Sequence, residues 1–251
     1  MPPAPSPGIM PSAAARAELT PRGNLRVAFP VASPLYVVKD PATASLRGVS
    51  IEIGTELARR LGVPFEACPY ATVGDLIRAT GAGEWDLATV VAEHEREAVL
   101  DFSPPYLEAD STYLVSQDSA IRSVPDADVT GMRIGVAERS AFDLFLTRTL
   151  RHASLVRYPG VTAAVEGFNA KESDAIAAPR PVLAAALSKI PPARILDDRF
   201  DVARAAIAMK KGRGAAALDF VNAFVAEVVA SGWLAQAIER CGIAGLRIAR
   251  S

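Results

Sequence analysis

The chain has 251 residues, of which 50% are hydrophobic, and its 27 lysines and arginines nearly balance 28 aspartates and glutamates. A chain of this length can bury one large core or two small ones. The net charge of -1 gives no sign of a nucleic-acid or other polyanionic partner. No apolar run reaches the ~18 residues that a membrane span needs, so we expect no transmembrane segment.

The N-terminal segment is rich in proline, alanine and serine. It lacks the basic start and the apolar core of a secretory signal peptide. We therefore predict a disordered tail over residues 1–23, and a cytoplasmic location stays open beside export. Cys68 and Cys241 match no metal-ligand spacing. We expect two buried thiols, with a disulfide as the alternative in an oxidising compartment.

Strand and helix patterns alternate along the first part of the chain. The helix after Ser50 has a serine at its start and Gly62 just past its end, and its apolar residues share one face. In chain order we expect a strand at 25–29, a Pro-rich turn, this helix, a strand at 65–69, a helix at 73–79 and a fully apolar strand at 87–91.

The same alternation begins again after a polar loop at 118–130. We expect strands at 111–115, 133–137, 155–158, 175–178 and 203–209, and helices after Ser140 and at 162–168, 181–187, 218–231 and 234–241. Two copies of the pattern, with two connections near 108–113 and 200–206, predict an α/β fold of two lobes. Ligands favour clefts between such lobes. A single doubly wound sheet is the alternative.

One stretch carries a specific signature. At 83–106 the chain has GEWDLATVVAEHEREAVLDFSPPY, in which Arg96 stands five residues before the Asp-Phe-Ser that begins at Asp101. This pattern resembles the central signature of the bacterial extracellular solute-binding proteins of family 3, the polar amino-acid-binding type of ABC-transporter substrate-binding protein. Further matching pieces lie at 47–49, 131–136, 173–175 and 206–212, so that the resemblance covers roughly residues 24–240.

The resemblance implies a type II periplasmic-binding-protein fold, in which two Rossmann-like lobes are joined by a two-strand hinge. Lobe 1 would comprise residues 24–107 plus 206–251, and lobe 2 residues 111–200. It also implies capture of a small molecule in the interlobe cleft for ABC-type uptake, with a permease as partner. A periplasmic, monomeric protein with no cofactor and no catalytic activity would fit the family.

The resemblance places the cleft residues as follows. Arg96 would clamp a ligand carboxylate, which suits the planar fork of a guanidinium. Ser140 lies at a strand-to-helix turn, where free N–H groups favour an anion. Tyr36 would supply an apolar wall. The other expected ligand-binding residues are Ser33, Thr89, Val91, Arg139 and Arg180.

Two departures from the family pattern bear on the ligand. Val91 stands where amino-acid binders usually have serine or threonine. Pro179, followed by Arg180, stands where they place an aspartate for the ligand's ammonium group. A buried ion that loses its partner costs several kcal/mol. With Arg96, Arg139 and Arg180 gathered at the cleft, we expect a carboxylated or anionic ligand without a free α-ammonium group.

Three alternatives share this fold. The first is a cytoplasmic ligand-binding or sensor protein. The second is a cyclohexadienyl-dehydratase-like enzyme, which needs a general acid or base; the candidates are Glu93, His94, Glu95 and Glu138. No Ser/His/Asp pattern, phosphate loop or metal cluster accompanies them. The third, the effector domain of a transcription regulator, is disfavoured because no helix-turn-helix segment precedes residue 24.

Overall fold

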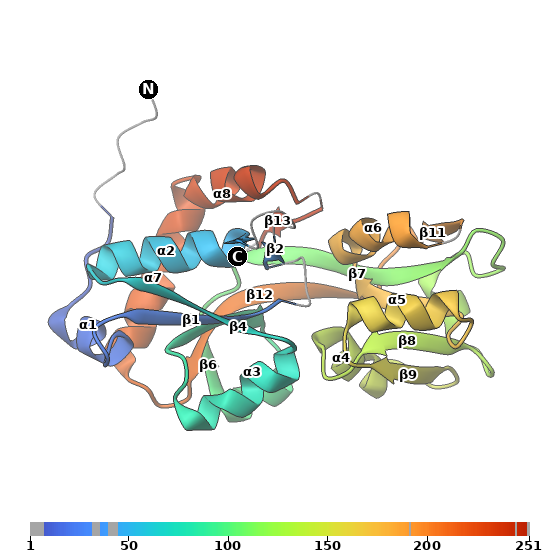
Figure 1. Ribbon diagram of the computed structural model, residues 1–251, viewed down its shortest axis with the longest axis horizontal. Helices are drawn as coiled ribbons and strands as arrows, with labels where there is room; N and C mark the ends of the chain where they lie inside the picture. The colour runs from blue at the N-terminus through green and yellow to red at the C-terminus, as the bar shows by residue number, and fades with distance from the viewer. Residues whose placement is uncertain (1–7, 32–35, 40–44, 191, 244, 250–251) are drawn as a thin grey trace.

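The computed structural model describes residues 8–31, 36–39, 45–190, 192–243 and 245–249. Two groups of helices and strands lie side by side, and two long strands pass from one group to the other (Figure 1). We call the group on the left of Figure 1 the first half and the group on the right the second half.

The first half contains both the beginning and the end of the described chain. Its helices are α1 (Ala13–Leu19), α2 (Val49–Leu61), α3 (Val73–Ala79), α7 (Ala215–Ala230) and α8 (Trp233–Cys241). Its strands are β1 (Leu25–Pro30), β2 (Val38–Lys39), β3 (Leu46–Arg47), β4 (Phe65–Tyr70), β5 (Leu87–Val91), β6 (Leu100–Phe102) and β13 (Arg247–Ile248). Short 3₁₀ turns η1 (Thr80–Ala82) and η2 (His94–Ala98) flank β5.

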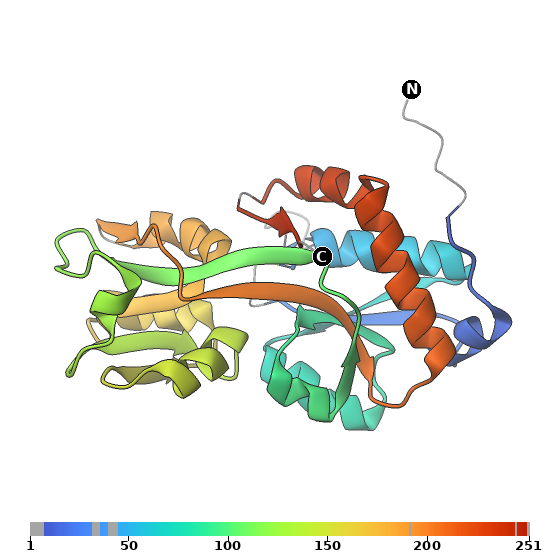
Figure 2. The same cartoon turned by 180° about the vertical axis from the view of Figure 1, so that it is seen from behind.

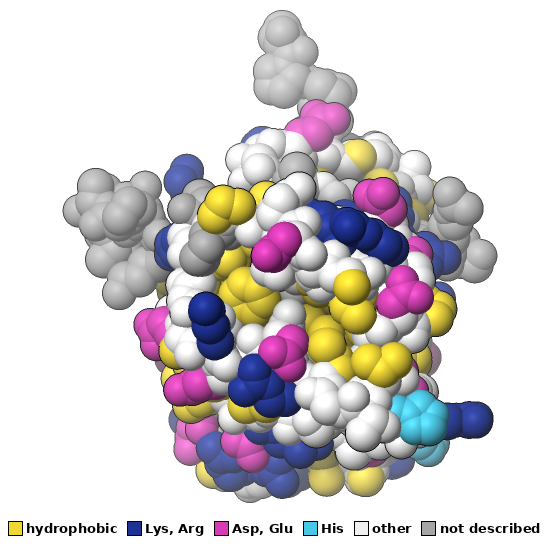
Figure 3. Space-filling view, turned by 90° about the vertical axis from the view of Figure 1, so that its right-hand side faces the viewer, with side chains coloured by type: hydrophobic (Ala, Val, Ile, Leu, Met, Phe, Trp, Pro, Cys, Tyr) yellow, Lys and Arg dark blue, Asp and Glu magenta, His cyan; other side chains and the backbone are white. Residues whose placement is uncertain are grey.

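The second half contains the strands β8 (Arg133–Ala137), β9 (Ser154–Tyr158), β10 (Ala175–Pro179) and β11 (Ala193–Ile195). Its helices are α4 (Ala141–Thr149), α5 (Val161–Asn169) and α6 (Arg180–Ala186), with 3₁₀ turns η3 (Val124–Ala127) and η4 (Leu187–Lys189). Positive and negative side chains intermingle on the end of this half that is turned away from the first (Figure 3).

One sheet runs through both halves, in the order β4-β1-β5-β12-β7-β10-β8-β9. The connecting strands are β7 (Leu107–Ser116) and β12 (Asp201–Lys210), which pair antiparallel over Leu107–Ser111 and Asp201–Ala205 (Figure 2). These segments overlap the crossings expected near 108–113 and 200–206. The expected α/β class is confirmed. The structure combines the two alternatives, because one sheet continues through both groups of elements.

The two halves repeat one structural device. In the first, Arg26 at the start of β1 donates to the Asp86 carboxylate from its backbone N–H, Nε and Nη2, and to the Gly83 carbonyl from Nη1. In the second, Arg133 donates to the Asp174 carboxylate from the same three groups, and its Nη2 also donates to the Lys171 carbonyl. Gly83 and Lys171 share a left-handed backbone, with φ near 63° and 61°. Asp86, which lies in the signature stretch 83–106, is therefore a fold-stabilising residue.

The N-terminal prediction differs from the structure for residues 13–19. This segment forms α1, which Ser12 caps and which packs Ala15 and Leu19 into the core against α7. Glu18 accepts a hydrogen bond from the Ala217 N–H at the start of α7. The average composition of the tail hid this pair of apolar residues, four positions apart on one helix face. Residues 1–7 lie outside the described residues.

The start of α2 also differs from the prediction. Gly48, not Ser50, is the N-cap. A side chain at Gly48, with φ near 146°, would collide with the Tyr36 carbonyl. Ser50 lies one residue inside the helix, where its buried hydroxyl is 2.6 Å from that of Thr89. The close approach of the Tyr36 segment to the helix therefore decides the cap.

Both cysteines are free and half-buried. Burial raises the pKa of the Cys68 thiol to about 11. In the part of the chain that the structure describes, no single helix is long and apolar enough to cross a membrane. The bent pair α7 and α8, at 76°, meets that test together by length and composition alone.

Candidate ligand-binding site

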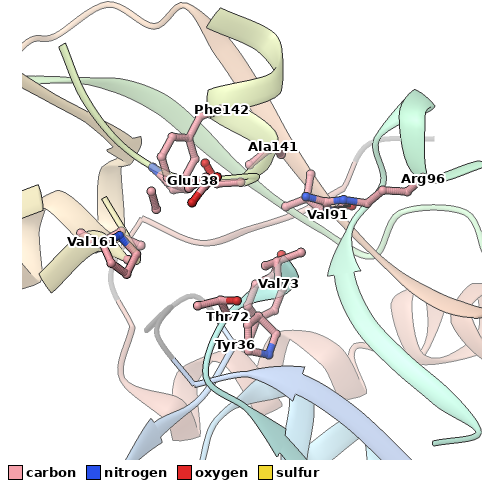
Figure 4. Close-up of a pocket in the computed structure, with 17 residues that line it drawn as sticks. Tyr36, Thr72, Val73, Val91, Arg96, Glu138, Ala141, Phe142 and Val161 are labelled. Atoms are coloured by element: carbon pink, nitrogen blue, oxygen red, sulfur yellow. Dashed lines mark hydrogen bonds between the residues drawn. The ribbon is translucent and has the colours of Figure 1, made fainter. Parts of the chain in front are cut away.

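A cavity lies between the two halves, at the carboxyl ends of β1, β5, β8 and β10 (Figure 4). The carboxyl ends of parallel strands are the usual ligand site of open α/β sheets. The first half contributes Pro30, Tyr36, Thr72, Val73, Val91 and Arg96, and β12 contributes Ala203. The second half contributes Ala137, Glu138, Ser140, Ala141, Phe142, Pro159, Gly160, Val161, Pro179 and Val182.

Arg96 is a buried cation on η2, and its side chain turns back toward the end of β5. Its Nη1 donates to the Val91 carbonyl at 2.7 Å, and its Nη2 donates to the Arg139 carbonyl at 3.1 Å. Among the described residues, no carboxylate forms an ion pair with it. Burial accordingly lowers the pKa of the Arg96 guanidinium. A buried charge held by neutral carbonyls is ready to receive an anionic group.

The turn at Glu138-Arg139-Ser140 is fixed by Asp143 on the first turn of α4. The Asp143 carboxylate accepts from the Arg139 N–H at 2.8 Å and pairs with Arg157 at 3.0 Å. The Ser140 hydroxyl in turn accepts from the Asp143 N–H. Arg139 has φ near 60°, which this network holds in place. The start of α4 is thereby held at the cavity wall.

The walls are largely apolar. Phe142 lies beside Glu138 on the second half, and Tyr36 and Thr72 lie across the opening on the first half (Figure 4). Burial raises the pKa of the Tyr36 phenol, so that it is uncharged at neutral pH. Of the described lining residues, only Arg96 and Glu138 carry a formal charge.

The structure brings together four of the eight residues predicted for the site: Arg96, Ser140, Val91 and Tyr36. Thr89 is fully buried beside Ser50, behind the cavity. Arg139 presents its carbonyl to Arg96, and its side chain borders an outer hollow. The Arg180 guanidinium donates to the Asp197 and Asp198 carbonyls and is not among the lining residues. Ser33 lies outside the described residues.

Several lining residues were not predicted, namely Thr72, Val73, Phe142, Pro159, Val161 and Val182. Most of them lie at the start of a helix that follows a strand. The sequence pattern predicts such positions, and they could have indicated these lining residues. Of the acid–base candidates, Glu138 alone lines the cavity. His94 is exposed and pairs with Glu97, while Glu93 and Glu95 pair with Arg148. Within the described ranges, no group of three or more His, Cys, Asp or Glu residues is placed to hold a metal ion.

A cavity between two groups of elements of an α/β sheet is typical of ligand-binding proteins, and comparison with known families agrees. Residues 25–242 match the model of the bacterial extracellular solute-binding proteins, family 3, and the chain belongs to that family. The resemblance inferred from the Asp-Phe-Ser signature is therefore confirmed.

Two curated relatives are glutamine-binding proteins, the second of them named for an ABC transporter. The chain is 26% identical over 183 residues to the glutamine-binding protein of Geobacillus stearothermophilus, covering 71% of this chain and 70% of that one. It is 22% identical over 217 residues to the glutamine-binding protein GlnH of Bacillus subtilis, covering 84% and 79%.

Solved structures share the fold. An amino acid ABC transporter substrate-binding protein from Streptococcus pneumoniae, bound to L-arginine, has a TM-score of 0.78 at 25% identity, covering 89% of this chain and 96% of that one. An ancestral amino acid-binding protein, a precursor of cyclohexadienyl dehydratase, has a TM-score of 0.76 at 25% identity, covering 90% and 98%.

Proposed function

We propose that this protein captures an amino acid in the cavity between its halves and delivers it to an ABC permease. The observation that carries the proposal is Arg96, a buried guanidinium with no carboxylate partner among the described residues. The ligand's carboxylate supplies that partner. The start of α4, which lies at the same wall, adds N–H groups and the positive end of a helix dipole.

An amino acid fits this cavity better than the anionic ligand that the sequence favoured. That hypothesis depended on Arg96, Arg139 and Arg180 facing the cleft together. Only Arg96 lines the cavity, and Glu138 places a negative charge in the same lining. A ligand carrying only negative charge would lie close to this carboxylate.

The proposal is a binding function without catalysis, as in the relatives, which are named for binding. A dehydratase needs a group that gives and a group that takes a proton. Of the described cavity residues, Glu138 is the one carboxylic acid, and burial raises the pKa of the Tyr36 phenol. The closure that follows capture would bend β7 and β12, the strands common to both halves.

Isothermal calorimetry of the purified protein against the twenty amino acids tests the proposal. We expect saturable binding of at least one amino acid at one site per chain. A matched titration with Arg96→Met should weaken binding by about two orders of magnitude, while Arg180→Met should leave it unchanged. Wild-type affinity in Arg96→Met, or a complete absence of binding in the panel, would contradict the proposal.

A further inference from the structure

We infer that Glu138 holds the ligand's α-ammonium group and that the site selects amino acids with apolar side chains. The inference rests on the proposed function and refines it. It starts from the end of β10, where Pro179 lines the cavity without any polar side-chain atom. An ammonium group in this cavity therefore needs a partner from another element.

Glu138 is placed to be that partner. It follows β8, its backbone N–H donates to the Tyr158 carbonyl at 2.8 Å, and its side chain lies at the cavity wall (Figure 4). No ion pair engages its carboxylate within the described part of the chain. The carbonyl that accepts from Arg96 belongs to the next residue, Arg139. One turn thus carries both a lining carboxylate and the carbonyl that holds the buried guanidinium.

The charges of the lining indicate the class of ligand. Arg96 and Glu138 are its only formal charges among the described residues, and they are opposite in sign. The carboxylate and ammonium of a zwitterion satisfy both. A basic side chain would add a cation, and an acidic one an anion, with no further partner in the lining. Charges left unpaired on removal from water are strongly disfavoured.

The rest of the lining indicates what side chain the ligand carries. Phe142, Val73, Val161 and Val182 surround the opening. Of the three lining hydroxyls, those of Thr72 and Ser140 are already engaged as helix caps, with Asp75 and Asp143, and that of Tyr36 hydrogen-bonds the Val91 backbone. A side-chain amide would therefore find few free partners, whereas an aliphatic or aromatic group gains from leaving water.

The test compares L-leucine with 4-methylpentanoate, which is leucine without its amino group, by calorimetry on the wild type and on Glu138→Gln. L-arginine, L-lysine and L-glutamine complete the panel. Glu138 is exposed, so the glutamine variant is expected to fold. The matched control is Glu166→Gln, the same change at an exposed position on α5. The readout is the preference for leucine over its desamino analogue.

The wild type should prefer leucine over the analogue by tenfold or more, and over arginine, lysine and glutamine by a similar factor. Glu138→Gln should reduce the leucine preference to about threefold or less, with the analogue's own affinity unchanged or improved. The Glu166→Gln control should keep the wild-type preference.

Two results would overturn the inference and leave amino-acid capture standing. One is leucine binding whose preference over the analogue is unaffected by Glu138→Gln. The other is tighter binding of arginine or lysine, lost selectively in Glu138→Gln, because Glu138 would then hold the side-chain cation. If no amino acid binds, the proposed function fails as well, and the inference falls with it.

Discussion

Replacing Arg96 by methionine should remove ligand binding without unfolding the protein. A guanidinium carries five N–H groups, and two of the groups on Arg96 donate to the Val91 and Arg139 carbonyls. Three N–H groups are left, enough for a carboxylate to bind with two hydrogen bonds. At about 1.5 kcal/mol for each charge-assisted bond, the loss is about 3 kcal/mol, or about 150-fold in Kd.

The unliganded variant should keep its stability. Burial lowers the pKa of Arg96, which means that the charged form is disfavoured in the folded protein relative to water. Methionine removes that cost and keeps an unbranched apolar stem, while two hydrogen bonds worth about 1 kcal/mol each are lost. The opposing terms leave the melting temperature of the free protein near that of the wild type.

Differential scanning fluorimetry and calorimetry separate the two effects. A saturating amino acid raises the melting temperature of the wild type by mass action, and this shift should vanish in Arg96→Met. Arg139→Met and Arg180→Met are the matched controls, since neither side chain lines the cavity. Retention of the wild-type affinity within about threefold in Arg96→Met would refute the reasoning.

Three further predictions concern the frame around the site. Asp86→Ala removes the carboxylate partner of buried Arg26 and of partly buried Arg213, so it should cost about 3–5 kcal/mol in urea unfolding. The equivalent Asp174→Ala, whose pair is about 40% exposed, should cost about 1 kcal/mol or less. Equal losses for the two variants would contradict this expectation. Hydrogen bonds from Arg247 and Arg199 lower the pKa of Asp110 to about 2, from an ordinary value of about 3.9. The ionised carboxylate therefore adds stability above about pH 4, which is lost as the pH falls toward 2. The stability difference between the wild type and Asp110→Asn should shrink over that window, and a constant difference would contradict this prediction. Arg148 on α4 pairs with Glu93 and Glu95 of the first half at 2.7 and 3.1 Å. Arg148→Met should therefore weaken ligand binding about two- to fivefold at low salt and have no effect near 1 M salt. Arg151→Met is the control, and an effect independent of salt would show that these ion pairs do not assist binding.

The patterns that the sequence carries locally predicted most of the elements. The apolar run of β5 and the glycines at positions 62 and 232 mark boundaries that the structure keeps, because burial and turn chemistry are encoded in neighbouring residues. Leu19 was missed because its partners lie on α7, far along the chain. Tertiary contacts decided that helix.

The site was predictable only where a residue's direction follows from the backbone pattern. Arg96 and Ser140 occupy turn positions that fix their placement at the cavity. Arg180 stands next to the cavity residue Pro179, yet its long side chain reaches the Asp197 and Asp198 carbonyls, which folding alone brings near. Glu138 was predicted in a turn at the cleft and as an acid–base candidate, and the sequence does not show whether its carboxylate has an ion-pair partner.

The most direct measurement of the central claim is a calorimetric comparison of the best-bound amino acid with its own carboxamide. The two ligands differ only in the group that Arg96 is proposed to receive. We predict that the amino acid saturates one site per chain and that the carboxamide binds at least a hundredfold more weakly. Equal affinity for the two would show that the ligand's carboxylate is not held by Arg96, and the account of this site would be wrong.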